Sequence, residues 1–387
     1  MDIYLDNAAT TFPKPKEVLN SMYEYMLNVG ANANRGNYSN SLTTNRYLYE
    51  ARELICEFFG FDKPSNVIFT NNVTTSLNIL IKGILKPGDH AITSSMEHNS
   101  VLRPLMICQK ANNINVDIIN ADSKGFIDSH KIENMINSKT KLVVITCASN
   151  VTGSIQNISE IGNICRKHNI FFLLDSSQGA GTLCIDMKSQ NINALAFTGH
   201  KNLLGPQGIG GFIIDDDFNN ECSTLLEGGT GSESYSLTQP DFLPDKFESG
   251  TLNMPGIVGL SSAIKYINNI GLLEIHNHNN YLLNYLINKL IHINHLNIYG
   301  DISGNNITTC LSINSKLLET SELCYYLERN GIKTRSGLHC APLAHKTIGT
   351  FPSGTVRISL SYFSTKEEMD YTIDVLNKLS SSSNIYL

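Results

Sequence analysis

The sequence predicts an α/β protein whose larger part is a mostly parallel sheet and whose smaller part is a second α/β unit. Two observations lead to this prediction. Short apolar, β-branched runs alternate with amphipathic segments along most of the chain, and longer helical segments take over after about residue 255. Such alternation is typical of a parallel sheet with helices on both faces. The 387 residues are enough for two domains with substantial cores.

The first part of the chain is expected to alternate helices and strands. Apolar side chains at helical spacing precede Gly60, which ends the first of these helices. The expected helices are 46–59, 74–85 and 158–168, and the expected strands are 67–70, 142–146, 170–174 and 211–214. Ligands of parallel sheets bind beyond the carboxyl ends of the strands, so polar residues directly after strands are candidates for the site.

The second part follows a boundary that Gly and Pro residues mark at 251–256. The expected elements are helices at 257–270 and 272–291, a strand near 307–313, a helix at 319–330 and a strand near 355–360. Ser364 and Glu367 form a predicted capping box that begins a last helix.

The composition excludes several functions. Lys and Arg number 29 against 35 Asp and Glu, a net charge of -6, which argues against a protein that coats nucleic acid or anionic lipid. No run approaches the roughly 18 apolar residues of a transmembrane helix, and the first residues carry no signal-peptide pattern. We therefore expect a cytoplasmic protein with no membrane or nucleic-acid partner. The nine cysteines form no CxxC and no zinc-ligand spacing, so no metal is expected.

The strongest local motif is Thr198-Gly199-His200-Lys201, which a Gly-rich run at 205–211 follows. A partly desolvated lysine can form a Schiff base with an aldehyde, and the glycines let the backbone approach a ligand. Taken alone, Lys201 fits a solvated surface lysine better than a Schiff-base lysine, because lysines are rarely buried.

A carboxylate at a strand end is the second motif. Asp175 ends an expected strand, and Gln178 follows three residues later. Asp175 can hold the proton of a pyridinium nitrogen, and Gln178 can bind a phenolate-type oxygen on the same ring. The alternative for Asp175 is the N-cap of a helix.

Two further segments carry candidate ligands. The hydroxyls at 73–76, together with free N–H groups at a helix N-terminus, can bind an anion, although ordinary capping explains them as well. His98 can stack on an aromatic cofactor or move a proton. A histidine in a polar loop often has neither role.

Together, these motifs resemble those of pyridoxal-phosphate enzymes of the class V aminotransferase group, and within it the cysteine desulfurases and selenocysteine lyases. The similar segments are 5–11 (LDNAATT), 97–100 (EHNS), 175–178 (DSSQ), 198–201 (TGHK), 247–251 (FESGT) and 335–342 (RSGLHCAP). The resemblance implies the type I fold of pyridoxal-phosphate-dependent transferases, with a seven-stranded-type sheet. It implies a large domain of residues 15–255, and a small domain of residues 1–14 plus 256–387 that carries the reactive cysteine loop.

The resemblance also implies how the cofactor is held. Lys201 is similar to the Schiff-base lysine, and Asp175 and Gln178 to the partners of the ring nitrogen and ring oxygen. His98 is similar to the histidine that stacks on the ring and assists protonation. The implied phosphate ligands are Thr74, Thr75, Thr198, His200 and Thr251, the last reaching the phosphate of the partner subunit in a homodimer. Many relatives have Glu at the place of Thr75, which leaves the role of Thr75 open.

The substrate contacts follow from the same resemblance. The implied contacts are Ala8, Asn150, Arg335 and Arg357. Asn150 is also implied as a cofactor contact. A guanidinium such as that of Arg357 suits the bidentate binding of a substrate carboxylate. A solvated arginine on a strand is the alternative for Arg357.

Cys340 decides which reaction the resemblance implies. Desulfuration needs a thiolate that attacks the substrate sulfur, and Arg335 and His339 are the neighbours expected to favour that thiolate. The Ser-Gly pair at 336–337 is expected to give the loop its freedom. The implied reaction converts L-cysteine to L-alanine and leaves a persulfide on Cys340 for an acceptor protein, as in the shorter-loop group of desulfurases.

Several alternatives stay open at this point. A selenocysteine lyase, with L-selenocysteine as substrate, would depend less on Cys340, and a related aminotransferase or epimerase would do no sulfur chemistry. A sulfur carrier or scaffold would bind no cofactor. The sequence names neither the acceptor nor the pathway served, whether iron–sulfur cluster assembly, thio-modified RNA or selenium metabolism.

Overall fold

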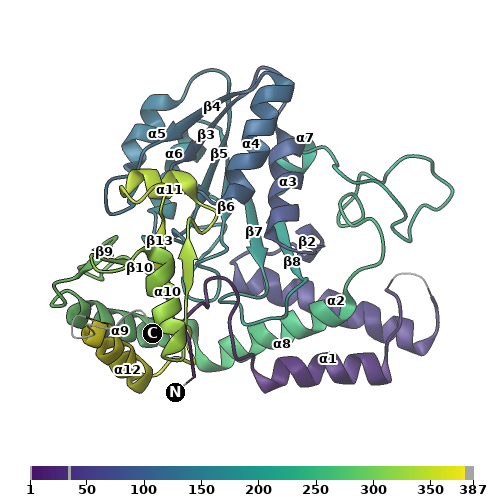
Figure 1. Ribbon diagram of the computed structural model, residues 1–387. Coiled ribbons are helices and arrows are strands. Elements are labelled where there is room, and N and C mark those ends of the chain that lie inside the picture. Colours follow the sequence, from purple (N-terminus) through teal and green to yellow (C-terminus); the bar gives the residue numbers. More distant parts are fainter. Residues whose placement is uncertain (1, 34–35, 380–387) are drawn as a thin grey trace.

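The structure is a computed structural model that describes residues 2–33 and 36–379 (Figure 1). The helices are α1 (Lys16–Asn28), α2 (Ser39–Phe58), η1 (Pro64–Asn66), α3 (Val73–Ile84), α4 (Asn99–Asn112), α5 (Ser129–Met135), α6 (Ile158–Lys167), α7 (Asp216–Glu221), α8 (Met254–Ile270), α9 (Leu272–Leu290), α10 (Thr320–Arg329), α11 (Pro342–Thr347) and α12 (Lys366–Lys378). Within the described ranges, none of these helices combines the length and the apolar character that crossing a membrane requires.

The strands form one large sheet and smaller ones. They are β1 (Ile3–Tyr4), β2 (Val67–Thr70), β3 (His90–Ser94), β4 (Asn115–Ile119), β5 (Thr140–Thr146), β6 (Phe171–Asp175), β7 (Ala194–Thr198), β8 (Gly210–Ile214), β9 (Leu296–Tyr299), β10 (Cys310–Ser315), β11 (Ile332–Lys333), β12 (Arg335–Gly337) and β13 (Thr355–Ser359). The large sheet has seven strands in the order β2-β8-β7-β6-β5-β3-β4. Within this sheet, neighbouring strands from β7 to β4 pair in parallel, and β8 runs antiparallel to both β7 and β2. The predicted fold class, a mostly parallel sheet of this size, is confirmed.

Helices cover both faces of the large sheet, as the apolar strands predict. In β5, Val143 and Ile145 point into one core and Leu142 and Val144 into the other, since successive side chains of a strand point to opposite faces. The first core also receives side chains from α2, α6 and α8, and the second from α3, α4 and α7. Figure 1 shows the sheet between these two groups of helices.

The C-terminal third of the chain builds a separate core. An antiparallel sheet in the order β12-β13-β10-β9 packs with α9, α10 and α12. Ile3 and Leu5 join this core, and β1 pairs in parallel with β11. The predicted division into residues 15–255 and the remainder stays a prediction, and its outer limits, residues 1 and 380–387, lie outside the described residues. By its packing, α8 belongs with the larger core.

Three details of the predicted elements are wrong. The helix expected at 46–59 begins at Ser39. The strand expected near 307–313 begins at Cys310. The last helix begins one residue later than expected, because Thr365 and Glu368 form its capping box. Ser364 instead accepts a hydrogen bond from the Ser361 N–H at 3.1 Å. The pattern Ser/Thr-x-x-Glu occurs in two overlapping registers here, so spacing alone could not choose between them.

Candidate active site

The segments that follow β2, β3, β5, β6 and β7 meet at one edge of the large sheet and enclose a cavity of about 220 Å³. This is the edge at which ligands of parallel sheets bind. Predicted site residues that line the cavity are Ala8, Thr74, His98, Asn150, Asp175, Gln178, Thr198, His200, Lys201, Arg335 and Arg357. Cys340, Thr75 and Thr251 are not among the lining residues.

The backbone at Lys201 is clamped by the N-terminal segment. The Thr11 N–H and the Lys14 Nζ donate to the His200 carbonyl at 3.0 and 2.7 Å, and the Thr11 hydroxyl donates to the Lys201 carbonyl at 2.7 Å. The side chain of Lys201 lines the cavity and is half-buried. This burial lowers the pKa of Lys201, and the charge of Arg357 lowers it further, whereas Asp175 opposes the shift. A lysine in such surroundings is a better nucleophile and base than a solvated one.

The carboxylate of Asp175 lies at the end of β6 and is 2% exposed. The N–H of Ser177 donates to Asp175 Oδ1 at 3.0 Å, and its hydroxyl donates to the same atom. Within the described chain no hydrogen bond reaches Asp175 Oδ2, which is left to meet a donor in the cavity. Burial raises the pKa of Asp175, while Ser177 and Lys201 oppose the shift. Gln178 Nε2 donates to the Ala8 carbonyl at 3.2 Å, and its Oε1 has no partner among the described residues.

Two buried polar atoms point to an anion subsite. Thr198 Oγ1 and His200 Nδ1 have no hydrogen-bond partner in the described part of the chain. A buried polar atom without a partner is costly, so a ligand is the expected partner. Burial lowers the pKa of His200 to about 4, so the imidazole is neutral at pH 7. Thr74 lies nearby in the first turn of α3, where helix N–H groups favour an anion.

His98 is the N-cap of α4. Its Nδ1 accepts a hydrogen bond from the Ser100 N–H at 3.1 Å, so the ring proton is on Nε2. Burial lowers the pKa of His98 to about 4, and the charges of Lys201, Arg335 and Arg357 add to the effect. The ring is therefore neutral at pH 7, and only Nε2 can give up a proton.

Arg357 is a buried cation in the cavity wall, not a solvated strand residue. Its side chain is 1% exposed, and its Nη2 donates to Asp6 Oδ1 at 2.7 Å. Its Nη1 donates to the Asn150 carbonyl at 3.2 Å, and its Nε has no partner among the residues described. The Nε–H is thus without a partner, and each Nη nitrogen has a second N–H, so the guanidinium can still donate to a carboxylate.

Cys340 lies in a tight turn next to the cavity and is exposed. The Ala341 N–H donates to the Leu338 carbonyl at 2.8 Å, and the two residues between them are in the left-handed region, with φ of 48° at His339 and 57° at Cys340. Each such residue costs on the order of 1–3 kcal/mol unless its surroundings hold it. Arg335 Nη2 lies 4.0 Å from Cys340 Sγ.

Two expectations for this loop are wrong. Ser336 and Gly337 lie in β12 and pair with Val356 and Thr355 of β13, so they do not loosen the loop. His339 is no cation, because burial, reinforced by Arg357, lowers its pKa to about 2. Arg335 is therefore the cation that accompanies the thiol.

Thr75 and Thr251 line another groove, of about 110 Å³. The Thr75 N–H and hydroxyl both bind Asn72 Oδ1, at 3.0 and 3.3 Å, so Thr75 takes part in the capping of α3. Thr251 is exposed. Its role toward a partner subunit stays a prediction.

Several residues of the site were not singled out from the sequence. Ser177 holds Asp175, Asp6 holds Arg357, and the Asn99 N–H donates to the Cys340 carbonyl at 2.7 Å. Each lies within a motif segment, one or two positions from a residue that was singled out. That adjacency is the signal that could have found them.

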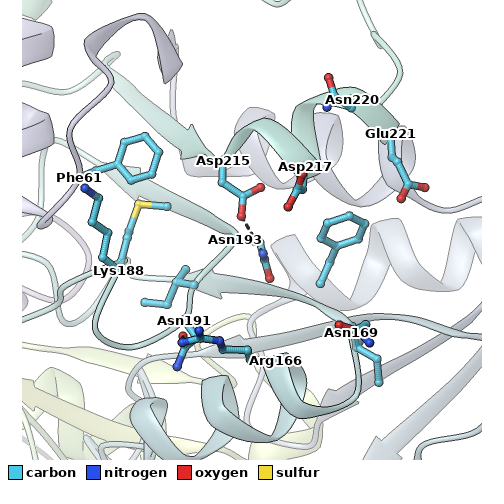
Figure 2. Close-up of a pocket in the computed structure, with 14 residues that line it drawn as sticks. Phe61, Arg166, Asn169, Lys188, Asn191, Asn193, Asp215, Asp217, Asn220 and Glu221 are labelled. Atoms are coloured by element: carbon cyan, nitrogen blue, oxygen red, sulfur yellow. Dashed lines mark hydrogen bonds between the residues drawn. The ribbon is translucent and has the colours of Figure 1, made fainter.

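A larger cavity, of about 690 Å³, lies at the opposite edge of the sheet (Figure 2). Its polar side chains bind one another: Asn193 Nδ2 donates to Asp215 Oδ2 at 2.7 Å, and Arg166 to Asn191 Oδ1 at 2.9 Å. None of the predicted site residues lines it. The smaller cavity is therefore the candidate active site.

The fold, with a half-buried lysine after β7 and a carboxylate at the end of β6, is that of the type I pyridoxal-phosphate-dependent enzymes. Residues 3–372 match the class-V aminotransferase family, and the chain belongs to that family. The expected resemblance is thereby confirmed.

Curated relatives and solved structures agree with this placement. A probable cysteine desulfurase of Methanothermobacter thermautotrophicus is 34% identical, over 98% of this chain and 94% of the relative. Another probable cysteine desulfurase, of Pyrococcus abyssi, is 32% identical over 98% of this chain and 94% of the relative. The structure of a cysteine desulfurase from Thermococcus onnurineus matches with a TM-score of 0.92 and 31% identity, over 98% of this chain and 95% of that one.

The cavity fits the cofactor of this family. Enzymes of the family use pyridoxal 5′-phosphate. The unpartnered Thr198 Oγ1 and His200 Nδ1 suit its phosphate, and the open Oδ2 of Asp175 suits its ring nitrogen. The amine of Lys201 suits its aldehyde.

Proposed function

We propose that this protein is a pyridoxal-phosphate-dependent cysteine desulfurase that moves sulfur from L-cysteine to Cys340 and releases L-alanine. The observation that carries the proposal is the exposed thiol of Cys340, held in a strained turn beside the Lys201 cavity with Arg335 at 4.0 Å. Aminotransferases and epimerases need no thiol in that place. The desulfurase names of the relatives support the same reaction.

Bound pyridoxal phosphate would supply an aldehyde for Lys201 and an electron-withdrawing ring. Asp175 would hold the ring nitrogen in its protonated form, with Ser177 fixing the carboxylate. Thr74, Thr198 and His200 would bind the phosphate. Gln178 would face the ring oxygen, and His98 would lie against the ring.

The chain's own groups would then act on the substrate in a fixed order. Arg357 would bind the substrate carboxylate. Asn150 and Ala8, which line the same cavity, would contact the bound substrate. Lys201, whose pKa burial lowers, would take the proton from the substrate α-carbon.

Cys340 would complete the reaction as a thiolate. Its sulfur would attack the substrate sulfur, and the carbon–sulfur bond would break with its electrons left on carbon. The sulfur would stay on Cys340 as a persulfide, and the remaining three-carbon unit would take up protons and leave as L-alanine. Cysteine and one thiol thus give alanine and one persulfide, so the step balances.

The two protein partners of this reaction are a second copy of the chain and a sulfur acceptor. α1 carries exposed apolar side chains along one face: Leu19, Tyr23, Met26 and Leu27. This face, which we call the α1 face, supports a homodimer. Part of the segment between α7 and α8 extends away from the rest of the chain (Figure 1). Thr251, near the end of this segment, is exposed in the groove beside Thr75, and both features support a site shared between subunits. An acceptor protein would reach Cys340 because the thiol is exposed.

The proposal is tested with the Cys340→Ser variant of the holoenzyme. The variant should keep the cofactor absorbance of the parent and lose sulfide and alanine formation from cysteine. Cys184 is another exposed cysteine, and Cys184→Ser is the matched control that should keep full activity. Normal alanine formation by the Cys340 variant would contradict the proposal.

The alternatives give other products in the same assay. A selenocysteine lyase would release selenide from selenocysteine with or without Cys340. An aminotransferase would give a keto acid, and an epimerase an inverted amino acid. A protein that never becomes yellow with the cofactor would be a carrier or scaffold.

A further inference from the structure

The position of the Cys340 thiol is set by the main chain of its turn. Of the two residues at the centre of the turn, Cys340 is exposed and His339 is 3% exposed. Arg335, at 4.0 Å, touches the sulfur only loosely. The sulfur is therefore only as well placed as the turn that carries it.

Two hydrogen bonds tie the carbonyls of this turn to the cavity. The Asn99 N–H donates to the Cys340 carbonyl at 2.7 Å, and Asn150 Nδ2 donates to the His339 carbonyl at 2.8 Å. Asn99 is the first residue of α4 and directly follows His98. The first turn of a helix has N–H groups without partners in the helix, so the thiol-bearing turn takes one of these groups. The turn that carries the thiol and the His98 ring are thereby both held at the N-terminal end of α4.

The imidazole of His339 ties the turn to the second sheet. His339 Nε2 lies 3.1 Å from the Thr355 carbonyl in β13. A carbonyl only accepts, so Nε2 carries the proton and donates it. The Thr355 hydroxyl donates to Ser312 Oγ at 2.9 Å, and Ser312 donates to the Val151 carbonyl at 2.7 Å. The anchor of the imidazole is therefore fixed to β10 and to the segment after β5.

We infer that His339 is a positioning residue for the sulfur-accepting thiol. Its buried imidazole holds the turn in the left-handed conformation, and this keeps the Cys340 carbonyl docked on α4 beside the cavity. The inference rests on the proposed function for its effect on catalysis, but not for its effect on the turn.

The experiment separates the imidazole from the backbone preference. Gly suits a left-handed backbone better than any other residue, so His339→Gly removes the anchor and relieves the strain. His339→Gln keeps an amide donor that can reach Thr355. In the holoenzyme, we expect the Gly variant to lose alanine formation about 10- to 100-fold in kcat, because misplaced reacting groups cost about that much. Although His339 lines the cavity, the kcat of the Gly variant should fall by more than its KM for cysteine changes, and its cofactor absorbance should stay the same. The Gln variant should retain most of the activity.

A second readout needs no substrate. Hydrogen–deuterium exchange of the peptides that contain Asn99 and Ala341 should become faster in the Gly variant and stay slow in the Gln variant. His339→Asn serves if the Gly variant does not fold, because Asn tolerates the left-handed region and is too short to reach Thr355. The matched control is His276→Gln, since His276 also bonds a carbonyl, that of Thr182 at 3.2 Å. That control should leave exchange and activity unchanged.

The outcomes are distinguishable. A Gly or Asn variant with the exchange and the kcat of the parent would overturn the inference. A Gln variant as impaired as the Gly variant would overturn the assignment of the anchor to the Nε2 donor. A parent enzyme that forms no alanine would contradict the proposed function, and the exchange measurement would still decide whether His339 anchors the turn.

Discussion

Arg357 Nη2 lies 2.7 Å from Asp6 Oδ1, and these two residues are 351 positions apart in the sequence. The pair joins the N-terminal segment to β13 in the wall of the candidate active site. The Arg357 side chain is 1% exposed and the Asp6 side chain 21%. Removing one partner of such a pair leaves a charge in protein surroundings without compensation.

We therefore expect Asp6→Asn to lower the free energy of unfolding by about 1–3 kcal/mol, the usual loss when a charged hydrogen bond becomes a neutral one. Urea unfolding of the cofactor-free protein measures the change. Asp62 forms an exposed ion pair with Lys188, and Asp62→Asn should cause no measurable change. Equal stability of the Asp6 variant and the parent would show that the Asp6 carboxylate does not compensate Arg357.

The unpartnered hydroxyl of Thr198 gives a prediction for cofactor binding. Thr198→Ala should weaken pyridoxal phosphate binding by about 10- to 100-fold, because a hydrogen bond to a charged group contributes about 1.5–3 kcal/mol. Absorbance titration gives the Kd. Pyridoxal, which lacks the phosphate, is the control ligand, and its Kd should be the same for variant and parent. Equal weakening of both ligands would mean that Thr198 does not contact the phosphate.

Glu97 makes the stability of the cofactor-free protein depend on pH. Burial raises the pKa of Glu97 from its ordinary 4.5 to about 8, although hydrogen bonds from Ser94 and the Thr146 N–H oppose the shift. The folded protein thus binds a proton that the unfolded protein has lost. The contribution of Glu97 to stability is complete below about pH 4.5 and is lost as the pH rises toward 8.

Glu97→Gln should remove this dependence. The amide oxygen can still accept from Ser94 and Thr146, and no charge has to be buried. Urea midpoints between pH 5 and 8 should fall less steeply for the variant than for the parent, and the exposed Glu57→Gln variant should follow the parent. Parallel pH profiles for the Glu97 variant and the parent would contradict an elevated pKa.

The α1 face gives a prediction for assembly. Leu27 is 62% exposed, and Leu27→Asp should convert a homodimer to monomers because it places a charge in an apolar interface. Sedimentation velocity measures the mass. The monomer should also bind cofactor more weakly, since Thr251 of a partner would be missing. Leu273, 71% exposed on α9, is the control position, and Leu273→Asp should remain a dimer. A monomeric parent would contradict the homodimer itself.

Local rules explain why much of the fold could be predicted. The alternation of Leu142, Val143 and Val144 between two cores is a property of one strand, and Asp175 lies where a strand ends. These features depend on residues that are close in the sequence, so they can be predicted from it. The capping box at Thr365 shows the limit of the same rules, because two registers fit the pattern and only the Ser361 contact with Ser364 separates them.

The remaining features depend on residues that only folding brings together. No periodic pattern in the sequence indicates that Cys340 docks on Asn99 or that Asp6 pairs with Arg357. The same holds for His339, which was expected to supply charge. Its neutrality follows from burial under α11 and β13, and burial at a loop position is decided by the rest of the molecule.

The clamp of the N-terminal segment on His200 and Lys201 has a consequence for the order of events during synthesis. β1 needs Ile332 and Lys333 as partners, and Asp6 needs Arg357. A ribosome makes residues 3–14 first, yet β1 and Asp6 have no partners until nearly all of the chain has emerged. The large sheet can collapse earlier, since domains fold as they are made. The catalytic centre is thus completed last, and a nascent chain halted before β11 would have both sides of the clamp but not the β1–β11 and Asp6–Arg357 contacts that anchor the N-terminal segment.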